Sequence, residues 1–91
     1  MNKQDLSIDV AVKFFLTQVE SEKIIDFILE DITKFLIKNK RVYFRGFGTF
    51  TRKRKKARRI RHPGTGKIIT IPAYYTVKFI PSKKLQKRMN N

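Results

Sequence analysis

The fold we predict depends on residues 46–73, which read GFGTFTRKRKKARRIRHPGTGKIITIPA. The stretch opens with a Gly-Phe-Gly corner at residues 46–48, where glycine permits backbone angles that other residues avoid. Eight Lys and Arg residues follow in residues 52–61, with no acid among them. A Pro- and Gly-rich turn at residues 62–66 leads into a β-prone run at residues 67–71. Two β-prone runs around such a turn predict a long, basic β-hairpin.

Charge is divided unevenly along the 91 residues, whose formal net charge is +15. Residues 1–31 hold all seven Asp and Glu residues and three lysines, so their net charge is −4. Residues 32–91 hold the other 19 Lys and Arg residues and no acid, which gives +19. Self-repulsion on this scale predicts a polyanionic partner, and nucleic acid is the commonest polyanion.

Other classes of function fit the composition poorly. A membrane surface is the competing polyanion, but the sequence has no long apolar run, signal peptide or lipidation motif. We therefore expect an intracellular protein with no membrane partner. The absence of cysteine and the single histidine argue against a disulfide or a metal site. No Ser/His/Asp or paired-carboxylate arrangement suits catalysis, so we expect neither an enzyme nor a cofactor.

Two helices are predicted before the hairpin, at about residues 3–14 and 18–38. Asn2 and Asp5 form a capping pair for the first helix, and a capping box at Thr17 opens the second. The apolar residues of the second helix cover a wider face than the single apolar stripe of a surface helix. Because a chain of this size has a marginal core, we infer that a partner subunit covers the remainder. The alternative is that these residues meet the sheet of the same chain.

The rest of the chain is predicted to form a sheet and a short helix. A first strand spans residues 41–45, a second starts at Thr49 and leaves the core near Arg52, and a third spans residues 76–79. Ser82 then caps a helix that runs to about residue 89.

We therefore predict one α+β domain over residues 1–91. Within it, residues 1–40 form a helical dimerisation part and residues 41–81 a sheet, from which an arm extends over about residues 52–72. Residues 82–91 form the C-terminal helix.

Residues spread over the whole chain match the pattern of one family. The combination of G-F-G-T-F, the basic run and R-x-P-x-T-G at Arg61 to Gly66 is specific. Through it the chain resembles the HU/integration host factor family of bacterial architectural DNA-binding proteins. The matching residues are Asn2, Lys3, Leu6, Thr17, Gly46 to Phe50, Ala57, Arg58, Arg61, Pro63, Thr65, Gly66, Ile69, Ile71 to Ala73, Phe79, Pro81, Lys83 and Leu85.

The resemblance implies an intertwined dimer with a helical base, a three-stranded antiparallel sheet in each subunit and two protruding β-ribbon arms. The arms curl around the duplex, and a proline at each tip, here Pro63, wedges between base pairs and kinks the DNA. The DNA-binding residues that we expect are Lys3, Gly46, Gly48, Lys53, Lys55, Arg58, Arg59, Arg61, His62, Pro63, Lys67, Lys83, Lys84 and Lys87.

Three of these residues depart from the family pattern. His62 stands where the family usually has asparagine, which changes the hydrogen-bonding groups beside the proline. Lys53 and Lys55 replace common arginines. Because lysine is a point charge and not a planar fork, we expect looser contacts at these two positions.

We expect an architectural, histone-like protein of the cytoplasmic nucleoid that binds duplex DNA through the minor groove, bends it and compacts it. We expect little sequence specificity and a preference for bent, nicked or distorted duplexes. The alternatives are a sequence-specific bender of the integration host factor type, a basic RNA- or ribosome-associated protein, and a membrane-surface or structural basic protein. A homodimer and a heterodimer with a paralogue both fit the sequence.

Overall fold

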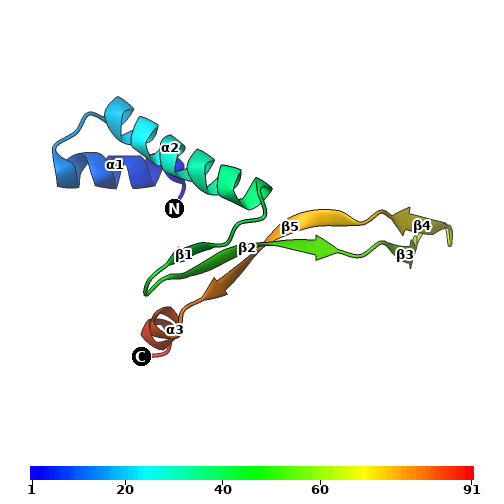
Figure 1. Cartoon of the computed structure of the whole chain (residues 1–91). Coiled ribbons are helices and arrows are strands. Elements are labelled where there is room, and N and C mark those ends of the chain that lie inside the picture. The colour runs from blue at the N-terminus through cyan, green and yellow to red at the C-terminus, as the bar shows by residue number, and fades with distance from the viewer. The chain divides into compact units, whose positions relative to one another are not determined.

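The computed structural model describes residues 1–91 as two compact units, shown in Figure 1. We call Met1–Phe35 the helical unit and Leu36–Asn91 the ribbon unit. The elements in chain order are α1 (Lys3–Phe14), α2 (Gln18–Ile37), β1 (Val42–Phe44), β2 (Gly48–Lys55), β3 (Arg58–Arg61), β4 (Ile68–Ile71), β5 (Tyr74–Pro81) and α3 (Lys83–Met89). The last two residues of α2 belong to the ribbon unit. The predicted α+β class is confirmed.

Both long helices begin with the reciprocal caps that the sequence predicts. The Asn2 side chain accepts a hydrogen bond from the Asp5 N–H at 2.8 Å, and the Asp5 carboxylate accepts one from the Asn2 N–H at 3.2 Å. Thr17 and Glu20 make the same exchange, with both bonds at 3.1 Å. Each pair satisfies two N–H groups that the first turn of a helix leaves without partners.

Two serines join the helices of the helical unit. Ser7 and Ser21 are fully buried, and the Ser21 hydroxyl donates to the Ser7 carbonyl oxygen at 2.7 Å. The Ser7 hydroxyl donates in turn to the Gln4 carbonyl oxygen at 2.7 Å. Small side chains allow α1 and α2 to approach closely, and both buried hydroxyls have a partner, so neither incurs the cost of an unpaired polar group.

The ribbon unit contains a three-stranded antiparallel sheet in the order β1-β2-β5 and a two-stranded extension, β3-β4. In the sheet, Phe50 lies opposite Val42 on one side and Phe79 on the other. The first strand is shorter than predicted. The third strand is longer than predicted, because β5 spans Tyr74–Pro81 and its ladder with β2 runs to the Lys55–Tyr74 pair.

The extension continues the same hairpin without an inserted residue. Two residues separate Lys55 from Arg58 on one strand, and two separate Ile71 from Tyr74 on the other. Pro72 lies in this gap and has no N–H to donate, which accounts for the interruption of the ladder. The hairpin is therefore one long ribbon with a short break.

Aromatic rings gather on one face of the three-stranded sheet. The Phe50 and Phe79 ring centroids are 4.7 Å apart, and Phe47 lies 5.3 Å from Phe79. Phe44 meets Phe50 edge-on at 6.4 Å. Such offset and edge arrangements suit the ring quadrupoles.

The single chain leaves much of its apolar surface uncovered. Ile25 and Leu36 are the only buried large hydrophobic side chains, whereas Phe27 is 69% exposed and Ile24 and Ile28 are also exposed on α2. None of the three helices has both the length and the apolar character needed to cross a bilayer.

Candidate nucleic-acid interface

The ribbon carries cations on both of its faces. Side chains alternate along a strand, and directly opposed residues share a face. Arg52 and Arg54 therefore lie on the face of Phe50 and Phe79, and Lys53 and Lys55 lie on the opposite face. In β3-β4, Arg58 and Ile60 share one face, and Arg59 and Arg61 share the other.

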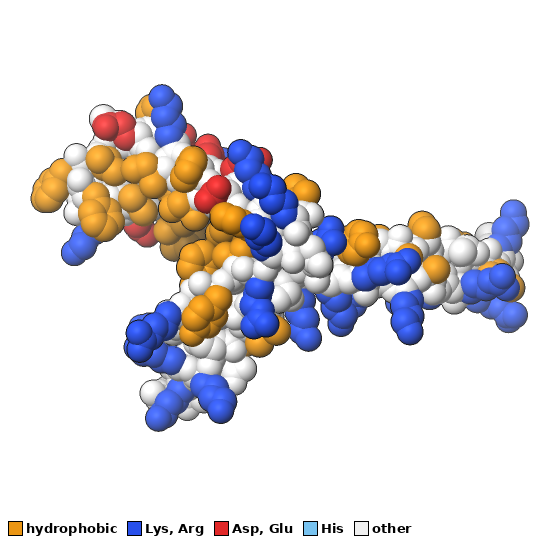
Figure 2. Space-filling model, in the orientation of Figure 1, with side chains coloured by type: hydrophobic (Ala, Val, Ile, Leu, Met, Phe, Trp, Pro, Cys, Tyr) orange, Lys and Arg blue, Asp and Glu red, His pale blue; other side chains and the backbone are white.

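Acidic side chains are confined to the helical unit. Figure 2 shows Lys and Arg side chains along the whole length of the ribbon and over α3. The ribbon unit contains no Asp or Glu, so no carboxylate side chain within it neutralises these cations. The electrostatic potential around the ribbon unit is therefore positive, as on a surface that binds a polyanion.

Arg52 differs from the other cations of the run because its head group is engaged within the chain. Its guanidinium lies 4.2 Å from the centroid of the Tyr75 ring and donates to the Ile37 carbonyl oxygen at 3.2 Å. Ile37 is the last residue of α2, where a cation complements the helix dipole. Arg52 thus fixes the base of the ribbon to the end of α2.

The tip of the ribbon is a closed turn over residues 62–67. The His62 N–H donates to the Lys67 carbonyl oxygen at 2.7 Å, and the Gly66 N–H donates to the His62 carbonyl oxygen at 2.9 Å. Gly66 has a φ of +70°, which glycine adopts without strain. Pro63 is exposed within this turn. A rigid apolar ring without an N–H thus stands at the end of a cationic ribbon.

The 46–48 corner has glycine at both ends, and the structural reason for glycine differs between the two positions. Gly46 has a φ of +77° in a turn closed by the Phe47 N–H and the Phe44 carbonyl oxygen at 3.0 Å. Gly48 is buried, and a Cβ there would lie 2.6 Å from the Ile80 carbonyl oxygen and the Phe79 ring. Packing explains Gly48, and DNA contact by either glycine stays a prediction.

The corner lies beside α3. The Ser82 N–H donates to the Phe47 carbonyl oxygen at 2.9 Å, and a Cβ built at Gly46 would lie 3.6 Å from Lys84 Cδ. Ser82 also caps α3 by accepting from the Leu85 N–H at 3.0 Å, as predicted. Lys84 of α3 therefore lies beside the turn, and the same short helix carries Lys83, Lys87 and Arg88.

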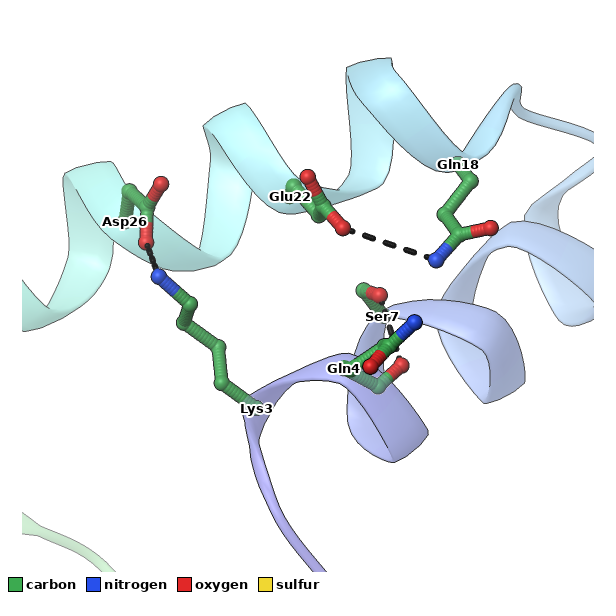
Figure 3. A network of polar contacts seen from close by, with 6 residues as sticks. All are labelled: Lys3, Gln4, Ser7, Gln18, Glu22 and Asp26. Atoms are coloured by element: carbon green, nitrogen blue, oxygen red, sulfur yellow. Dashed lines mark hydrogen bonds and ion pairs between the residues drawn. The ribbon is translucent and has the colours of Figure 1, made fainter.

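Lys3 lies in the helical unit and is paired there. Its Nζ donates to the Asp26 carboxylate at 2.8 Å, as Figure 3 shows. This hydrogen bond and the Asp26 charge hold the pKa of Lys3 above its usual value. Both side chains are about half exposed, so a competing anion could reach the ammonium group.

The structure thus brings the predicted site residues together in groups. Arm residues Lys53 to Lys67 share the ribbon, and Gly46 lies with Lys84 at the corner. The prediction omitted Arg54 and Lys56, which lie within the same basic run and are exposed. Their place within an unbroken run of cations could have indicated both of them.

The chain is similar to known proteins over its full length. A family model described as "Bacterial DNA-binding protein" matches residues 1–90. Integration host factor subunit alpha of Buchnera aphidicola is 38% identical over 91 residues, covering 100% of this chain and 89% of that protein. DNA-binding protein HU of Lactococcus lactis is 42% identical over 85 residues, covering 93% of each.

Solved structures agree with the sequence matches. The HU of an Anabaena HU–DNA cocrystal structure has a TM-score of 0.88 and 30% identity, covering 98% of this chain and 97% of that one. A mutant HU from Thermotoga maritima has a TM-score of 0.72 and 29% identity, covering 98% and 99%.

The fold and the ribbon define a class of small α+β proteins that carry a basic two-stranded arm. Within that class, the chain belongs to the bacterial DNA-binding protein family of HU and integration host factor.

Proposed function

We propose that this protein binds duplex DNA through the minor groove as a dimer, bends it and compacts it, without catalysing a reaction and in association with the nucleoid. The observation that supports this most strongly is the ribbon. It has cations on both faces, no acidic side chain in its unit and an exposed proline at its tip. A two-stranded ribbon of this kind fits a DNA groove.

Affinity would come mainly from neutralised phosphates. The ribbon cations proposed for this role are Lys53, Lys55, Arg58, Arg59, Arg61 and Lys67, and the body cations are Lys3, Lys83, Lys84 and Lys87. Each neutralised phosphate contributes about −0.9 to the slope of log K against log salt. Lys3 would exchange Asp26 for a phosphate oxygen when a bent duplex reaches it.

Bending would come from Pro63. Unstacking a base step costs about a few kcal/mol, and bending a short site costs roughly 1–6 kcal/mol. A proline can enter a stack without burying an unpaired N–H. New phosphate contacts along the body would offset the cost of the bend.

The dimer is supported by what the single chain leaves exposed. Ile24, Ile28 and Phe35 lie on one side of α2 and are exposed, and the aromatic rings Phe44 and Phe79 are also exposed. A second copy would cover the exposed apolar side chains of each unit. Ile28→Glu should therefore shift sedimentation equilibrium from dimer towards monomer, whereas Lys23→Glu on the same helix should leave the dimer intact. A wild-type protein that sediments as a monomer would contradict the dimer.

Weak sequence specificity is the finer part of the proposal, and sequence-specific bending of the integration host factor type is the second candidate. Both kinds of relative match more than nine tenths of the chain, at 38% and 42% identity. Binding to random, nicked and defined-site duplexes at several salt concentrations separates them. We expect nicked duplexes to bind best and sequence to matter little. Duplex RNA should compete poorly, because its wide, shallow minor groove does not grip a ribbon.

A further inference from the structure

The imidazole of His62 forms part of the turn that carries Pro63. Its Nδ1 accepts hydrogen bonds from the Gly64 N–H at 3.1 Å and from the Thr65 N–H at 3.3 Å. Both donors lie within three residues of His62, on the far side of the proline. The side chain therefore links His62, which precedes the proline, to the backbone that follows the proline.

Gly64 provides the room that the ring needs. A Cβ at this position would lie 3.2 Å from Cε1 and 3.4 Å from Nδ1 of the imidazole. A side chain there would require the ring to shift by a few tenths of an ångström. Its φ lies outside the left-handed region, so close approach of the ring is the structural reason for glycine here.

The two accepted bonds also fix the position of the ring proton. A neutral imidazole has one N–H and one acceptor nitrogen. Because Nδ1 accepts, the proton resides on Nε2. Nε2 has no partner within the chain, and the residue is exposed. The tip thus presents one oriented N–H beside Pro63.

We infer that His62 is a positioning residue for the wedge: its Nδ1 holds the turn around Pro63, and its Nε2–H donates to an acceptor on the duplex, a phosphate oxygen or a base edge of the minor groove. This inference rests on the proposed DNA bending. Minor-groove edges of A·T and T·A pairs present only acceptors, so one donor can meet either.

The charged groups around the turn are all cations. Arg58, Arg59 and Arg61 lie on β3 and Lys67 lies before β4, and residues 32–91 contain no acidic side chain. A doubly protonated imidazolium has no acceptor nitrogen, so protonation would remove both bonds. His62 would then be one more cation on an open turn.

Two variants separate the two roles of the side chain. Asn at position 62 keeps an acceptor for the same N–H groups, as in an Asx-turn, and does not titrate. Ala keeps neither role. Since the change is at an exposed turn, both variants should fold with the wild-type thermal midpoint.

The first measurement uses the free protein. Imidazole ¹⁵N shifts should show the Nε2–H form, and hydrogen exchange at Gly64 and Thr65 should be roughly three- to tenfold faster in His62→Ala, with little change in His62→Asn. An Nδ1–H tautomer, or unchanged exchange in His62→Ala, would overturn the inference.

The second measurement uses end-labelled duplexes at saturation. The bend angle should fall in His62→Ala and be kept at least in part in His62→Asn. An unchanged bend angle in His62→Ala would refute the positioning role. Failure of the proposed function would look different, because the wild type itself would leave the duplex straight.

Discussion

The guanidinium of Arg52 lies 4.2 Å from the ring centroid of Tyr75, its diagonal neighbour across the β2-β5 ladder. The same group donates to the carbonyl oxygen of Ile37 at the end of α2. Lys53, the next residue, lies on the opposite face and is exposed. Adjacent cations of one basic run therefore differ: Arg52 is held within the chain, and we propose that Lys53 is free to bind DNA.

Arg52→Ala and Lys53→Ala each remove one positive charge per subunit, so they form a matched pair. Arg52→Ala should lower the free energy of unfolding by about 1–2 kcal/mol, because it removes a cation–π interaction and a charge-assisted hydrogen bond. Lys53→Ala should change it by less than about 0.5 kcal/mol. Urea unfolding at one protein concentration measures both. Equal stabilities would show that the Arg52 interactions contribute nothing.

In DNA binding we expect the opposite ranking, with the larger effect from Lys53→Ala and the smaller from Arg52→Ala. Lys53→Ala should reduce the magnitude of the salt slope, by about 0.9 for each phosphate that the protein no longer neutralises. Arg52→Ala should leave the slope nearly unchanged. A larger change in slope for Arg52→Ala would place its guanidinium on the DNA and not on Tyr75.

Phe15 is 96% exposed and ends α1 with φ 58° and ψ 43°, in the left-handed region. This conformation strains residues other than glycine and, to a lesser extent, asparagine. Phe15→Gly should therefore stabilise the protein by about 0.5–1 kcal/mol. Asn39→Gly, at a φ of 60°, should change stability by only a few tenths of a kcal/mol. A destabilised Phe15→Gly would indicate that the Phe15 ring is buried in the assembled protein.

Glu20 gives the α2 cap a pH dependence. The Thr17 N–H donates to its carboxylate, and this bond holds the pKa of Glu20 below its ordinary value of 4.5. A lowered pKa in the folded state contributes stability above the unfolded pKa, and this contribution is lost as the pH falls through the folded pKa. Glu20→Gln should therefore flatten the fall in stability below about pH 4.5.

Glutamine still fits a capping box, so stability at neutral pH should change little in Glu20→Gln. The double variant Thr17→Val/Glu20→Gln serves as the control. It should be less stable but show no further flattening of the pH profile. If Glu20→Gln loses stability at acidic pH as steeply as the wild type does, the cap does not form in solution.

Arg58 and Arg61 lie on opposite faces of the β3-β4 extension. Their joint replacement by alanine should flatten the salt dependence of DNA binding, since neither side chain can then neutralise a phosphate. Lys23→Ala/Lys34→Ala on α2 removes the same charge and should preserve the slope. If the two double variants behave alike, net charge and not the ribbon governs binding.

Local chemistry explains which parts of the fold were predictable. The caps at Asn2–Asp5, Thr17–Glu20 and Ser82 each involve residues three apart, so the sequence contains the whole interaction. The start of β5 depends on the pairing of Tyr74 with Lys55, which lie far apart in the chain, and the predicted third strand, residues 76–79, was too short for that reason.

The buried crossing of α1 and α2 had no sequence signal. Ser7 and Ser21 are polar and fourteen residues apart, and neither lies in an apolar pattern. The role of Arg52 was also hidden, because one arginine among eight cations is distinguished only by its position over the Tyr75 ring. For the candidate site, the composition of the basic run was enough to predict the ribbon. Assigning each cation to a face of the ribbon required the pairing register of the strands, which the sequence does not contain.

Bending of the duplex by the ribbon tip is the central claim, and the angle measured on saturated, end-labelled DNA tests it most directly. The wild type should bend the duplex strongly, and Pro63→Ala should lose more of the bend than of the affinity, because the phosphate contacts remain. A duplex that stays straight with the wild-type protein, or a bend that Pro63→Ala preserves in full, would contradict the account.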